Sequence, residues 1–518
     1  MGFSILMHDL TRSSQRTLGR ATGLFVAVAL AAALVGLGPV APAPIAAPAV
    51  LAADPGIQPR VTGIAPLSHQ VYGYLPYWRL DSGTVDRLDY DLVSTIAFFG
   101  LGIKADGNLD TAWRGYAAYT SANAAAVTNA AHAKGVRVVP TFQLFDSSSL
   151  TRMSAFLNSP TARERFIGQA LDLMARRSAD GANVDFEPVP STIAPAFVAF
   201  IGQFRTALRA RFPTATLVVA TSAGAPSNLI DGLAPIVDQM FVMTYNYRWS
   251  GSTVTGAIAP LDNTTRTVKR HITRFLSHVP PSKLIMGVPF YGYDWPVTSD
   301  VPNATVRANP SSYGGVWSVT YGSAMKWLAE HPDVPRQEDT NEGSGFFTYW
   351  DADEGTFRQV YFEDELSAAA KYDYAIATTL AGIGLWTLDG DRGFSQMQDV
   401  LRAKFYAPIH AVTVSAKVGT VSLRSGYVRA YHAEWVRNTG NVPETGILSW
   451  RIVDRFGHVI RRGSTKLTVY PGRTKKISAS TLLGSAAGLP AGTYRLLARF
   501  VAPTGTWRAP AFKFRQPY

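Results

Sequence analysis

Short apolar runs recur along the chain between residue 71 and residue 388, and each run is bounded by polar residues or glycine. Their length and their many β-branched and aromatic residues are typical of strands buried on both faces. Helix-like stretches, with apolar residues three and four positions apart, separate several of the runs. The runs occupy residues 71–75, 94–99, 136–142, 182–187, 216–221, 240–245, 283–290 and 382–388. Eight strands that alternate with helices predict an α/β fold, a (β/α)8 TIM barrel over residues 71–408.

The last interval between these runs is too long for a single crossover helix. Within residues 296–380, two segments, 345–351 and 358–364, have the apolar and aromatic content of further strands. We therefore predict a small α+β insertion at about 296–380, before the eighth strand. On the loop side of the barrel it would wall a cleft.

The pattern changes after about residue 408. Apolar and polar residues then alternate, glycine and proline mark turns, and the helical spacing disappears. Regular short strands of this kind predict an all-β sandwich of immunoglobulin-like type over residues 409–518.

The N-terminal segment, residues 1–53, has the parts of an export signal. Arg12, Arg16 and Arg20 precede an uncharged apolar run of about eighteen residues, and small residues lead to Ala52 and Ala53. The alternative is an uncleaved membrane anchor, because the run reaches the lower limit for spanning a bilayer. Either interpretation predicts a secreted or cell-surface protein. Residues 54–70 are rich in turn formers and are predicted to be a linker.

Composition narrows the chemistry. With 47% apolar and 17% charged residues, the chain is not intrinsically disordered. It has no cysteine, which excludes disulfides, thiol nucleophiles and cysteine-ligated zinc. Nine histidines form no HExxH pair, so we expect no metal and no cofactor.

The fourth predicted strand contains the most informative polar residues. Because side chains alternate along a strand, Asn183, Asp185 and Glu187 point to one side, and Val184 and Phe186 to the other. Glu187 would lie nearest the carboxyl end of the strand, where the active sites of such barrels are found. Two buried carboxyl groups one step apart do not ionise together, so one keeps its proton near neutral pH. A carboxyl group of that kind can act as a general acid.

This segment resembles the DxxDxDxE motif of glycoside hydrolase family 18, the chitinases and their relatives that act on N-acetylglucosamine polymers. Asp180, Asn183, Asp185 and Glu187 stand at its defined positions. The resemblance covers about residues 70–400 and does not extend to the sandwich. Further matches lie in residues 73–78, 243–246, 287–292, 360–375 and 382–391.

The resemblance implies a retaining, substrate-assisted mechanism. Glu187 would protonate the glycosidic oxygen and later activate water. Asp185 would hold the substrate's acetamido group, whose oxygen attacks the anomeric carbon, while Tyr245 donates to that oxygen. Trp386 would form the floor under the reacting sugar. Further substrate contacts are expected from Asp180, Asn183, Asn246, Met243, Tyr74 and Trp78, with Trp249 and Trp295 as additional candidates.

Two positions depart from the commonest chitinase pattern, because Asn183 and Asn246 replace aspartates. The asparagine form is similar to the branch with spore-cortex and other peptidoglycan-directed members. Chitin and peptidoglycan therefore both remain candidate substrates. A non-catalytic glycan-binding protein on the same barrel is the alternative, although an intact Glu187, Asp185 and Tyr245 argue against it.

The basic excess of the chain lies in its last part. Lys and Arg number 49 against 37 acidic residues overall, but residues 410–518 alone hold seventeen cations and three acids. This favours an anionic cell-wall polymer as a partner of the sandwich. A solvated basic face or a structural spacer is the alternative. We expect a monomer and no nucleic acid partner. The densest group of cations is Arg461, Arg462, Arg473, Lys475 and Lys476.

Overall fold

The computed structural model describes residues 54, 56–61, 67–406, 410–440, 443–470 and 473–517. The predicted export signal or anchor in residues 1–53 lies outside the described residues. Among the helices in the described ranges, none is long and apolar enough to cross a membrane.

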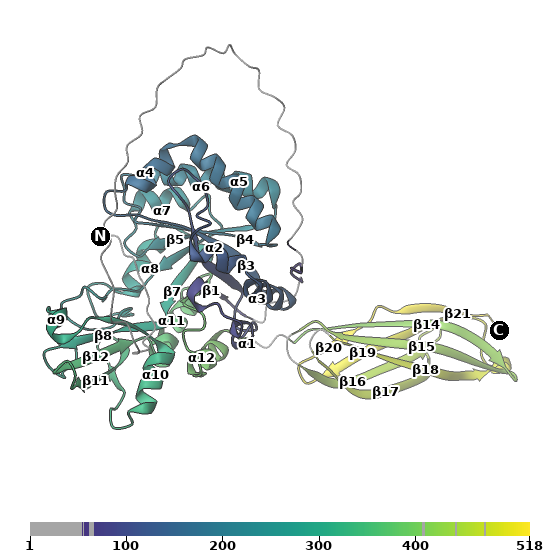
Figure 1. Ribbon diagram of the computed structural model, residues 1–518. Helices are drawn as coiled ribbons and strands as arrows, with labels where there is room; N and C mark the ends of the chain where they lie inside the picture. Colours follow the sequence, from purple (N-terminus) through teal and green to yellow (C-terminus); the bar gives the residue numbers. More distant parts are fainter. Residues whose placement is uncertain are drawn as a thin grey trace, which may run out of the picture.

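Eight parallel strands close into a barrel that helices surround (Figure 1). Neighbouring strands follow the chain order, and β13 pairs with both β7 and β1. The predicted barrel is confirmed, and each predicted run coincides with one of its strands. The barrel strands are β1 (Gln70–Pro76), β2 (Thr95–Gly102), β3 (Arg137–Phe145), β4 (Gly181–Glu187), β5 (Thr216–Ser222), β6 (Gln239–Met243), β7 (Leu284–Pro289) and β13 (Gly382–Trp386).

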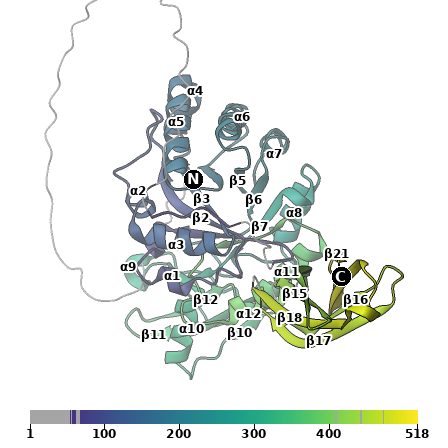
Figure 2. The ribbon, with the colours of Figure 1, turned by 90° about the vertical axis from the view of Figure 1, so that its right-hand side faces the viewer.

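Helices surround these strands, and α4 to α8 follow one another around the barrel (Figure 2). Several begin at capping residues: Ser121 accepts from the amide of Ala124, and Asp364 forms a capping box with Ser367. The helices of the ring are α1 (Thr84–Arg87), α2 (Arg114–Tyr119), α3 (Ala122–Ala133), α4 (Thr151–Asn158), α5 (Pro160–Arg176), α6 (Ala194–Arg211), α7 (Ser227–Leu233), α8 (Val268–Leu276), α11 (Glu365–Ala377) and α12 (Gln396–Phe405), with short 3₁₀ turns at Tyr77–Arg79 and Pro281–Lys283.

Aromatic packing between β4 and the helices orients the fourth strand. Phe186 points outward, where its ring lies 5.6 Å from that of Phe200 and 5.8 Å from that of Phe156, centroid to centroid. All three side chains are buried. Since neighbouring side chains of a strand point to opposite faces, Asp185 and Glu187 are directed into the barrel interior, as the alternation predicts.

The insertion is a five-stranded sheet in the order β10-β11-β12-β8-β9. Its bounds differ from the predicted 296–380 at both ends. β8 begins directly after β7, at Tyr291, and α11 contacts β7, β13 and α12, so that helix completes the barrel ring. The inserted elements are β8 (Tyr291–Val297), α9 (Pro310–Tyr313), β9 (Trp317–Thr320), α10 (Tyr321–Glu330), β10 (Gln337–Asp339), β11 (Ser344–Asp351) and β12 (Thr356–Phe362).

The predicted linker is partly wrong, because its described residues pack on the barrel. The amide of Asp54 donates to the carbonyl of Arg176 at 2.7 Å, and that of Val61 to the carbonyl of His132 at 3.0 Å. Ile57 is buried. Residues 54–61 therefore cover α3 and α5 where they are described.

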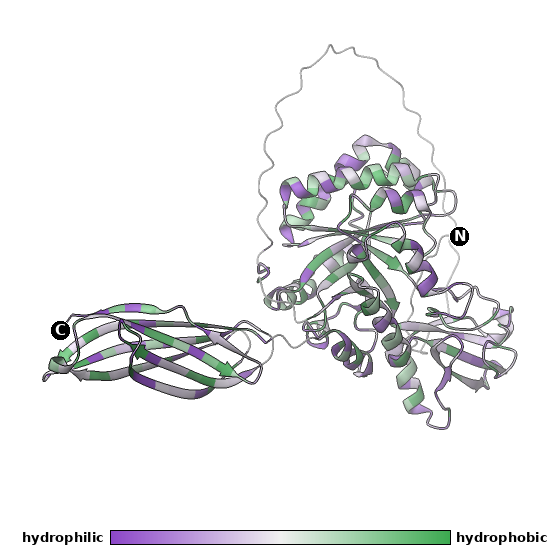
Figure 3. Cartoon of the chain, turned by 180° about the vertical axis from the view of Figure 1, so that it is seen from behind, coloured by the Kyte–Doolittle hydropathy of each residue, from purple (hydrophilic) through white to green (hydrophobic). Residues whose placement is uncertain are grey.

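The C-terminal part is all β, as predicted. A three-stranded antiparallel sheet, β14-β15-β18, faces a second sheet, β17-β16-β19-β20, in which β21 also pairs with β19. Hydrophobic and hydrophilic residues alternate along these strands (Figure 3), and the buried ones form the cores between the sheets. The strands are β14 (Val412–Arg424), β15 (Tyr427–Asn438), β16 (Glu444–Val453), β17 (Val459–Val469), β18 (Thr474–Ser485), β19 (Gly492–Ala502), β20 (Gly505–Arg508) and β21 (Phe512–Gln516), with a 3₁₀ turn at Ala486–Gly488.

Candidate active site

Three polar side chains of β4 enter the barrel interior in a row. Asn183 is buried, and its amide nitrogen donates to the hydroxyl of Tyr74 at 3.0 Å and to that of Thr141 at 3.3 Å. Asp185 is 3% exposed, and its Oδ1 has no hydrogen-bond partner among the residues that the structure describes. Glu187 is the last residue of the strand and is half-buried. The row therefore leads from the packed interior to the carboxyl end of the barrel.

Burial changes the acidity of both carboxyl groups. It raises the pKa of Glu187 to about 7. Burial, followed by the charge of Glu187, raises the pKa of Asp185 well above its ordinary value. Two desolvated carboxyl groups on one strand favour a state with fewer than two charges, so the pair holds a proton near neutral pH.

Tyr245 lies directly after β6 and faces the same carboxyl groups. Burial raises the pKa of its hydroxyl well above 10, and the charges of Asp185 and Glu187 raise it further. The hydroxyl therefore remains a hydrogen-bond donor at any physiological pH. Gly287 makes room for the ring, since a Cβ there would lie 2.8 Å from Cε1 of Tyr245. Met243, the last residue of β6, is half-buried.

Asn246 connects the barrel to the insertion. Its Oδ1 accepts from the hydroxyl of Tyr293 at 2.9 Å and from that of Tyr291 at 3.5 Å, both on β8. Its φ of 64° lies in the left-handed region, which asparagine tolerates better than most residues. The ring of Tyr291 also lies edge-on to Tyr245, with centroids 6.2 Å apart. Neither tyrosine was singled out in the sequence, although their alternate spacing in YGYDW is a strand signal.

An aromatic cluster forms at the carboxyl end of β1, β2 and β13. Trp386 is largely buried, and its ring centroid lies 4.8 Å from that of Phe99, 5.3 Å from that of Tyr74 and 6.5 Å from that of Trp78. Trp78 is half-buried. Phe99 was not predicted to be part of the site, because in the sequence it is indistinguishable from the apolar core of β2. The cluster is an apolar floor beside the carboxyl pair.

A comparison with models of protein families identifies the family of this chain. The model of glycosyl hydrolases family 18 matches residues 70–391, which is more than half of the chain. The chain belongs to glycosyl hydrolases family 18. The resemblance seen in the sequence is confirmed, and the sandwich lies outside the matched region.

The names of similar curated proteins are of two kinds: enzymes of sporulation or the spore cortex, and di-N-acetylchitobiases. The sporulation-specific glycosylase YdhD of Bacillus subtilis is 28% identical over 65% of this chain and 78% of its own length. The cortical fragment-lytic enzyme of Bacillus anthracis is 27% identical over 47% of this chain, which spans about half of that enzyme (53%). Human di-N-acetylchitobiase is 27% identical over 49% of this chain and 68% of its own length.

Solved structures show the same fold. The allosamidin complex of the Group IV chitinase of Ostrinia furnacalis superposes with a TM-score of 0.56 at 22% identity, covering 65% of this chain and 98% of that one. The family 18 barrel and the insertion before its last strand are thus the structural frame of the site.

The first aspartate of the family motif does not reach the site. Asp180 precedes β4, at the end opposite to Glu187, and the prediction that it contacts substrate is wrong. Its carboxylate accepts from Nε of Arg60 at 2.8 Å, from the amide of Val138 at 2.8 Å and from Nε2 of His132 at 3.0 Å. Although burial raises the pKa of Asp180, these three donors hold it below its ordinary value. This residue stabilises the barrel.

Two predicted aromatic contacts are also wrong. Tyr74 is buried, its ring packs edge-on against Trp386, and its hydroxyl accepts from Asn183, so the ring presents no face to a sugar. Trp295 is 0% exposed, and its Nε1 donates to the carbonyl of Trp249 at 3.2 Å. Trp78 and Trp249 are half-buried and remain candidates for sugar contact.

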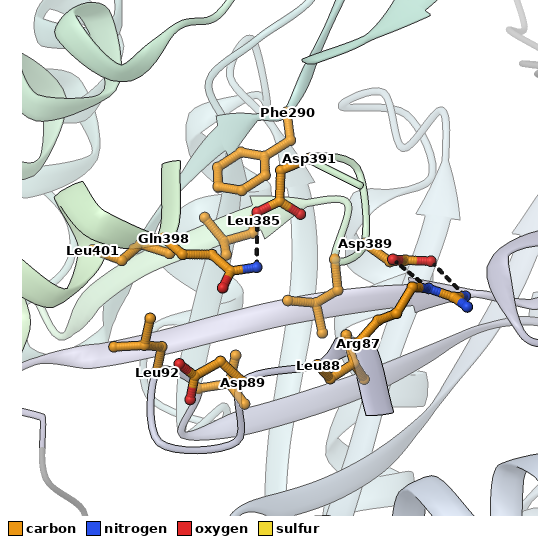
Figure 4. A pocket seen from close by; sticks show the side chains of 12 residues that line it. Arg87, Leu88, Asp89, Leu92, Phe290, Leu385, Asp389, Asp391, Gln398 and Leu401 are labelled. Atoms are coloured by element: carbon orange, nitrogen blue, oxygen red, sulfur yellow. Dashed lines mark hydrogen bonds and ion pairs between the residues drawn. The ribbon is translucent and has the colours of Figure 1, made fainter. Parts of the chain in front are cut away.

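The acidic residues after β13, Asp389 and Asp391, contact α1 and α12. Nε of Arg87 donates to Asp389 at 2.9 Å, and Nε2 of Gln398 donates to Asp391 at 3.0 Å (Figure 4). They border a mostly apolar cavity of about 30 Å³, which is too small for a sugar ring. In this family 18 chain, the end of the 382–391 motif therefore fastens α1 and α12 to the barrel.

Proposed function

We propose that the chain is a secreted glycosidase that cleaves β-1,4 bonds after N-acetylglucosamine units by a retaining, substrate-assisted mechanism. The observation that carries this proposal is Glu187, a carboxyl group with a pKa raised to about 7 by burial at the carboxyl end of the barrel. Membership of family 18 supplies the substrate class.

The first chemical step breaks the glycosidic bond. Glu187 donates its proton to the glycosidic oxygen as the bond from that oxygen to the anomeric carbon breaks. The acetamido oxygen of the same sugar attacks the anomeric carbon and forms a cyclic oxazolinium intermediate. Asp185 accepts a hydrogen bond from the acetamido N–H, and the Tyr245 hydroxyl donates to the acetamido oxygen. No carboxylate of the enzyme becomes covalently attached.

The second step restores the enzyme. The Glu187 carboxylate takes a proton from water, and the resulting hydroxide attacks the anomeric carbon and opens the ring. Two inversions at the same carbon give retention. The apolar floor around Trp386 suits the C–H face of the reacting sugar and limits access of bulk water.

Peptidoglycan is the favoured polymer. Asn183 and Asn246 match the asparagine branch of the family, and one relative is named a cortical fragment-lytic enzyme. The basic sandwich fits attachment to an anionic cell wall. Chitin is the second candidate, because another relative is a di-N-acetylchitobiase.

Product analysis tests the proposal. Residues 54–518 and the Glu187→Gln variant are incubated with purified peptidoglycan and with chitin oligomers, and the products are identified by mass spectrometry. We expect reducing-end N-acetylglucosamine products from peptidoglycan, and a loss of about 10²- to 10⁴-fold in the variant. If products form from chitin oligomers alone, chitin replaces peptidoglycan as the proposed substrate. If neither polymer yields products, the result favours a non-catalytic glycan-binding protein.

A further inference from the structure

The outer face of the β14-β15-β18 sheet combines aromatic rings, hydroxyl groups and cations. We call it the aromatic face, and it consists of the side chains that the strand register places on the solvent side. Its members are Thr413, Ser415, Lys417, Thr420, Ser422 and Arg424 on β14; Tyr427, Arg429, Tyr431, Ala433, Trp435 and Arg437 on β15; and Thr474, Lys476, Ser478, Ser480, Leu482 and Ser485 on β18.

Three aromatic side chains lie in a line along the central strand of this face. Tyr427, Tyr431 and Trp435 are each four residues apart, which corresponds to about 13 Å at the usual rise of a strand. Tyr427 is 52% exposed and Tyr431 is 45% exposed, while Trp435 is half-buried. Exposed aromatic side chains in a row are uncommon on a sheet face that has no partner.

Hydroxyl groups and cations flank the aromatic line on both sides. Tyr431 lies between Thr420 on β14 and Ser480 on β18, and Trp435 lies between Ser415 and Lys476. Nζ of Lys476 lies 5.6 Å from the centre of the Trp435 ring, within the range of a cation–π contact. A ligand stacked on this ring would meet a positive charge at once.

The aromatic face carries no acidic residue. The three acids of the sandwich each contact a histidine instead: Glu434 lies 2.7 Å from His432, Glu444 lies 2.5 Å from His410 and Asp454 lies 2.9 Å from His458. Five cations on the face, Lys417, Arg424, Arg429, Arg437 and Lys476, thus give it an uncompensated positive charge.

The outer face of the second sheet has the charge without the rings. Arg451 on β16 lies between Arg462 on β17 and Leu497 on β19. Four residues earlier on β16, Ile447 lies between Lys466 on β17 and Val501 on β19. None of these described residues is aromatic. The two faces therefore differ in chemistry although both are basic, and the second provides an internal comparison for the first.

We propose that the aromatic face binds the glycan strand of peptidoglycan, an N-acetylhexosamine polymer that carries carboxylates. The rings of Tyr427, Tyr431 and Trp435 stack on pyranose faces spaced along the strand, which offer C–H surface. Serine and threonine hydroxyls bind sugar hydroxyls and acetamido groups, and the cations pair with the carboxylates. Tyrosine and tryptophan give large contact areas at low cost in side-chain entropy.

A protein partner fits this face less well, because protein interfaces have an apolar centre, whereas the rows between these rings are mostly polar. These rows are Ser422, Arg429 and Leu482, and then Lys417, Ala433 and Ser478. The identity of the polymer rests on the proposed function, and the existence of a glycan site on the sandwich does not.

Binding of the full chain to insoluble polymers tests the site. All proteins carry Glu187→Gln, so that the polymer is not cut during the measurement. Sedimentation at 0.15 M salt compares peptidoglycan freed of teichoic acid, intact walls and chitin. The test variant combines Tyr431→Ser with Trp435→Ser. One matched control combines Arg451→Ser with Arg499→Ser on the outer face of the second sheet. The other is Tyr470→Ser, an aromatic residue directly after β17 that is 60% exposed.

We expect the aromatic pair to weaken binding to teichoic-acid-free peptidoglycan by about tenfold or more, and each control to change it less than about twofold. Unchanged binding of the aromatic pair would overturn the proposal. An equal loss of binding in the arginine pair would also overturn it, because it would indicate unspecific attraction by positive charge. Binding that requires teichoic acid, or binding to chitin that is tighter than binding to peptidoglycan, would overturn it as well.

The outcome remains distinguishable from that for the catalytic proposal. With Glu187 present, each sandwich variant should cleave soluble oligosaccharides at the parent rate and unfold at the parent temperature. If the parent cleaves nothing but binds through the aromatic face, only the catalytic proposal fails.

Discussion

Asn183 on β4 donates a hydrogen bond to the hydroxyl of Tyr74 on β1 across the barrel interior, at 3.0 Å. Because an amide carries no charge, this contact adds no ion beside Asp185, two residues further along the strand. The carboxyl pair Asp185 and Glu187 therefore titrates without a third acid below it.

An Asn183→Asp variant should shift the alkaline limb of activity to higher pH. A third buried carboxyl group disfavours the charged forms of its neighbours, so the pKa of Asp185, and through it that of Glu187, rises. The pH dependence of kcat/KM on a soluble oligosaccharide measures the shift, with Asn183→Ser as the uncharged control. A limb that stays in place or moves to lower pH would contradict this account.

The parent enzyme should lose activity as pH rises above about 7. Glu187 must carry a proton to act as the acid, and burial raises its pKa to about 7. Above that value, kcat/KM should fall about tenfold for each pH unit. A plateau that extends to pH 9 would show that another group supplies the proton.

Glu187→Gln should stabilise the fold at pH 8 but not at pH 4. The pKa of Glu187 is raised from 4.5 to about 7 on folding, so the folded state binds this proton more tightly. Stability is therefore lost as pH rises between these values, and the variant avoids the loss. Urea unfolding should show a gain on the order of 3 kcal/mol at pH 8. Glu164→Gln, at an exposed position of α5, is the control and should show no pH-dependent gain.

Asp180→Asn should reduce stability and leave KM unchanged. The carboxylate accepts from Arg60, His132 and the amide of Val138, and its pKa is lowered in the folded state. Its contribution, about 1–3 kcal/mol, is present at neutral pH and disappears as pH falls through that lowered pKa.

Thermal unfolding at several pH values, with steady-state kinetics, checks this prediction. Asp172→Asn, which removes a more exposed contact with Arg211, is the control and should cost less. A rise in KM for Asp180→Asn would contradict this account and would indicate that Asp180 contacts substrate.

Tyr293→Phe should lower kcat by several-fold with little change in KM. The lost hydroxyl holds Asn246, the residue after Tyr245, at 2.9 Å. Tyr245 would then be less well oriented toward the acetamido oxygen. Tyr349→Phe removes a hydroxyl that donates to Asp294 in the same insertion and serves as the control. Equal kinetic effects of the two variants would assign the change to the insertion as a whole.

Much of the site could be predicted from the sequence, because the patterns that indicate it lie within single strands. The period of two along β4 places Asp185 and Glu187 on one side, and Phe186 on the other, whatever the rest of the chain does. The apolar runs likewise mark the barrel strands, since strands covered by helices on one side and packed side chains on the other are apolar throughout.

Burial and partners were not readable, because they depend on segments far apart in the chain. Trp78, Trp249 and Trp295 each follow a predicted strand in the sequence, yet Trp295 is enclosed and the other two are only half-buried. Tyr74, near the end of the first predicted strand, is enclosed as well. Similarly, Asp180 belongs to the motif, but Arg60 and His132, 120 and 48 residues away, determine that it stabilises the barrel.

Local pattern and composition were enough to predict the fold class, the position of the acid and the location of the positive charge in the last part of the chain. The folded arrangement was needed to show that Glu187 is desolvated, that Asn246 is held by the insertion and that Tyr427, Tyr431 and Trp435 line one cationic face. Solvation and juxtaposition are properties of the folded chain, because they arise when distant segments exclude water from one another.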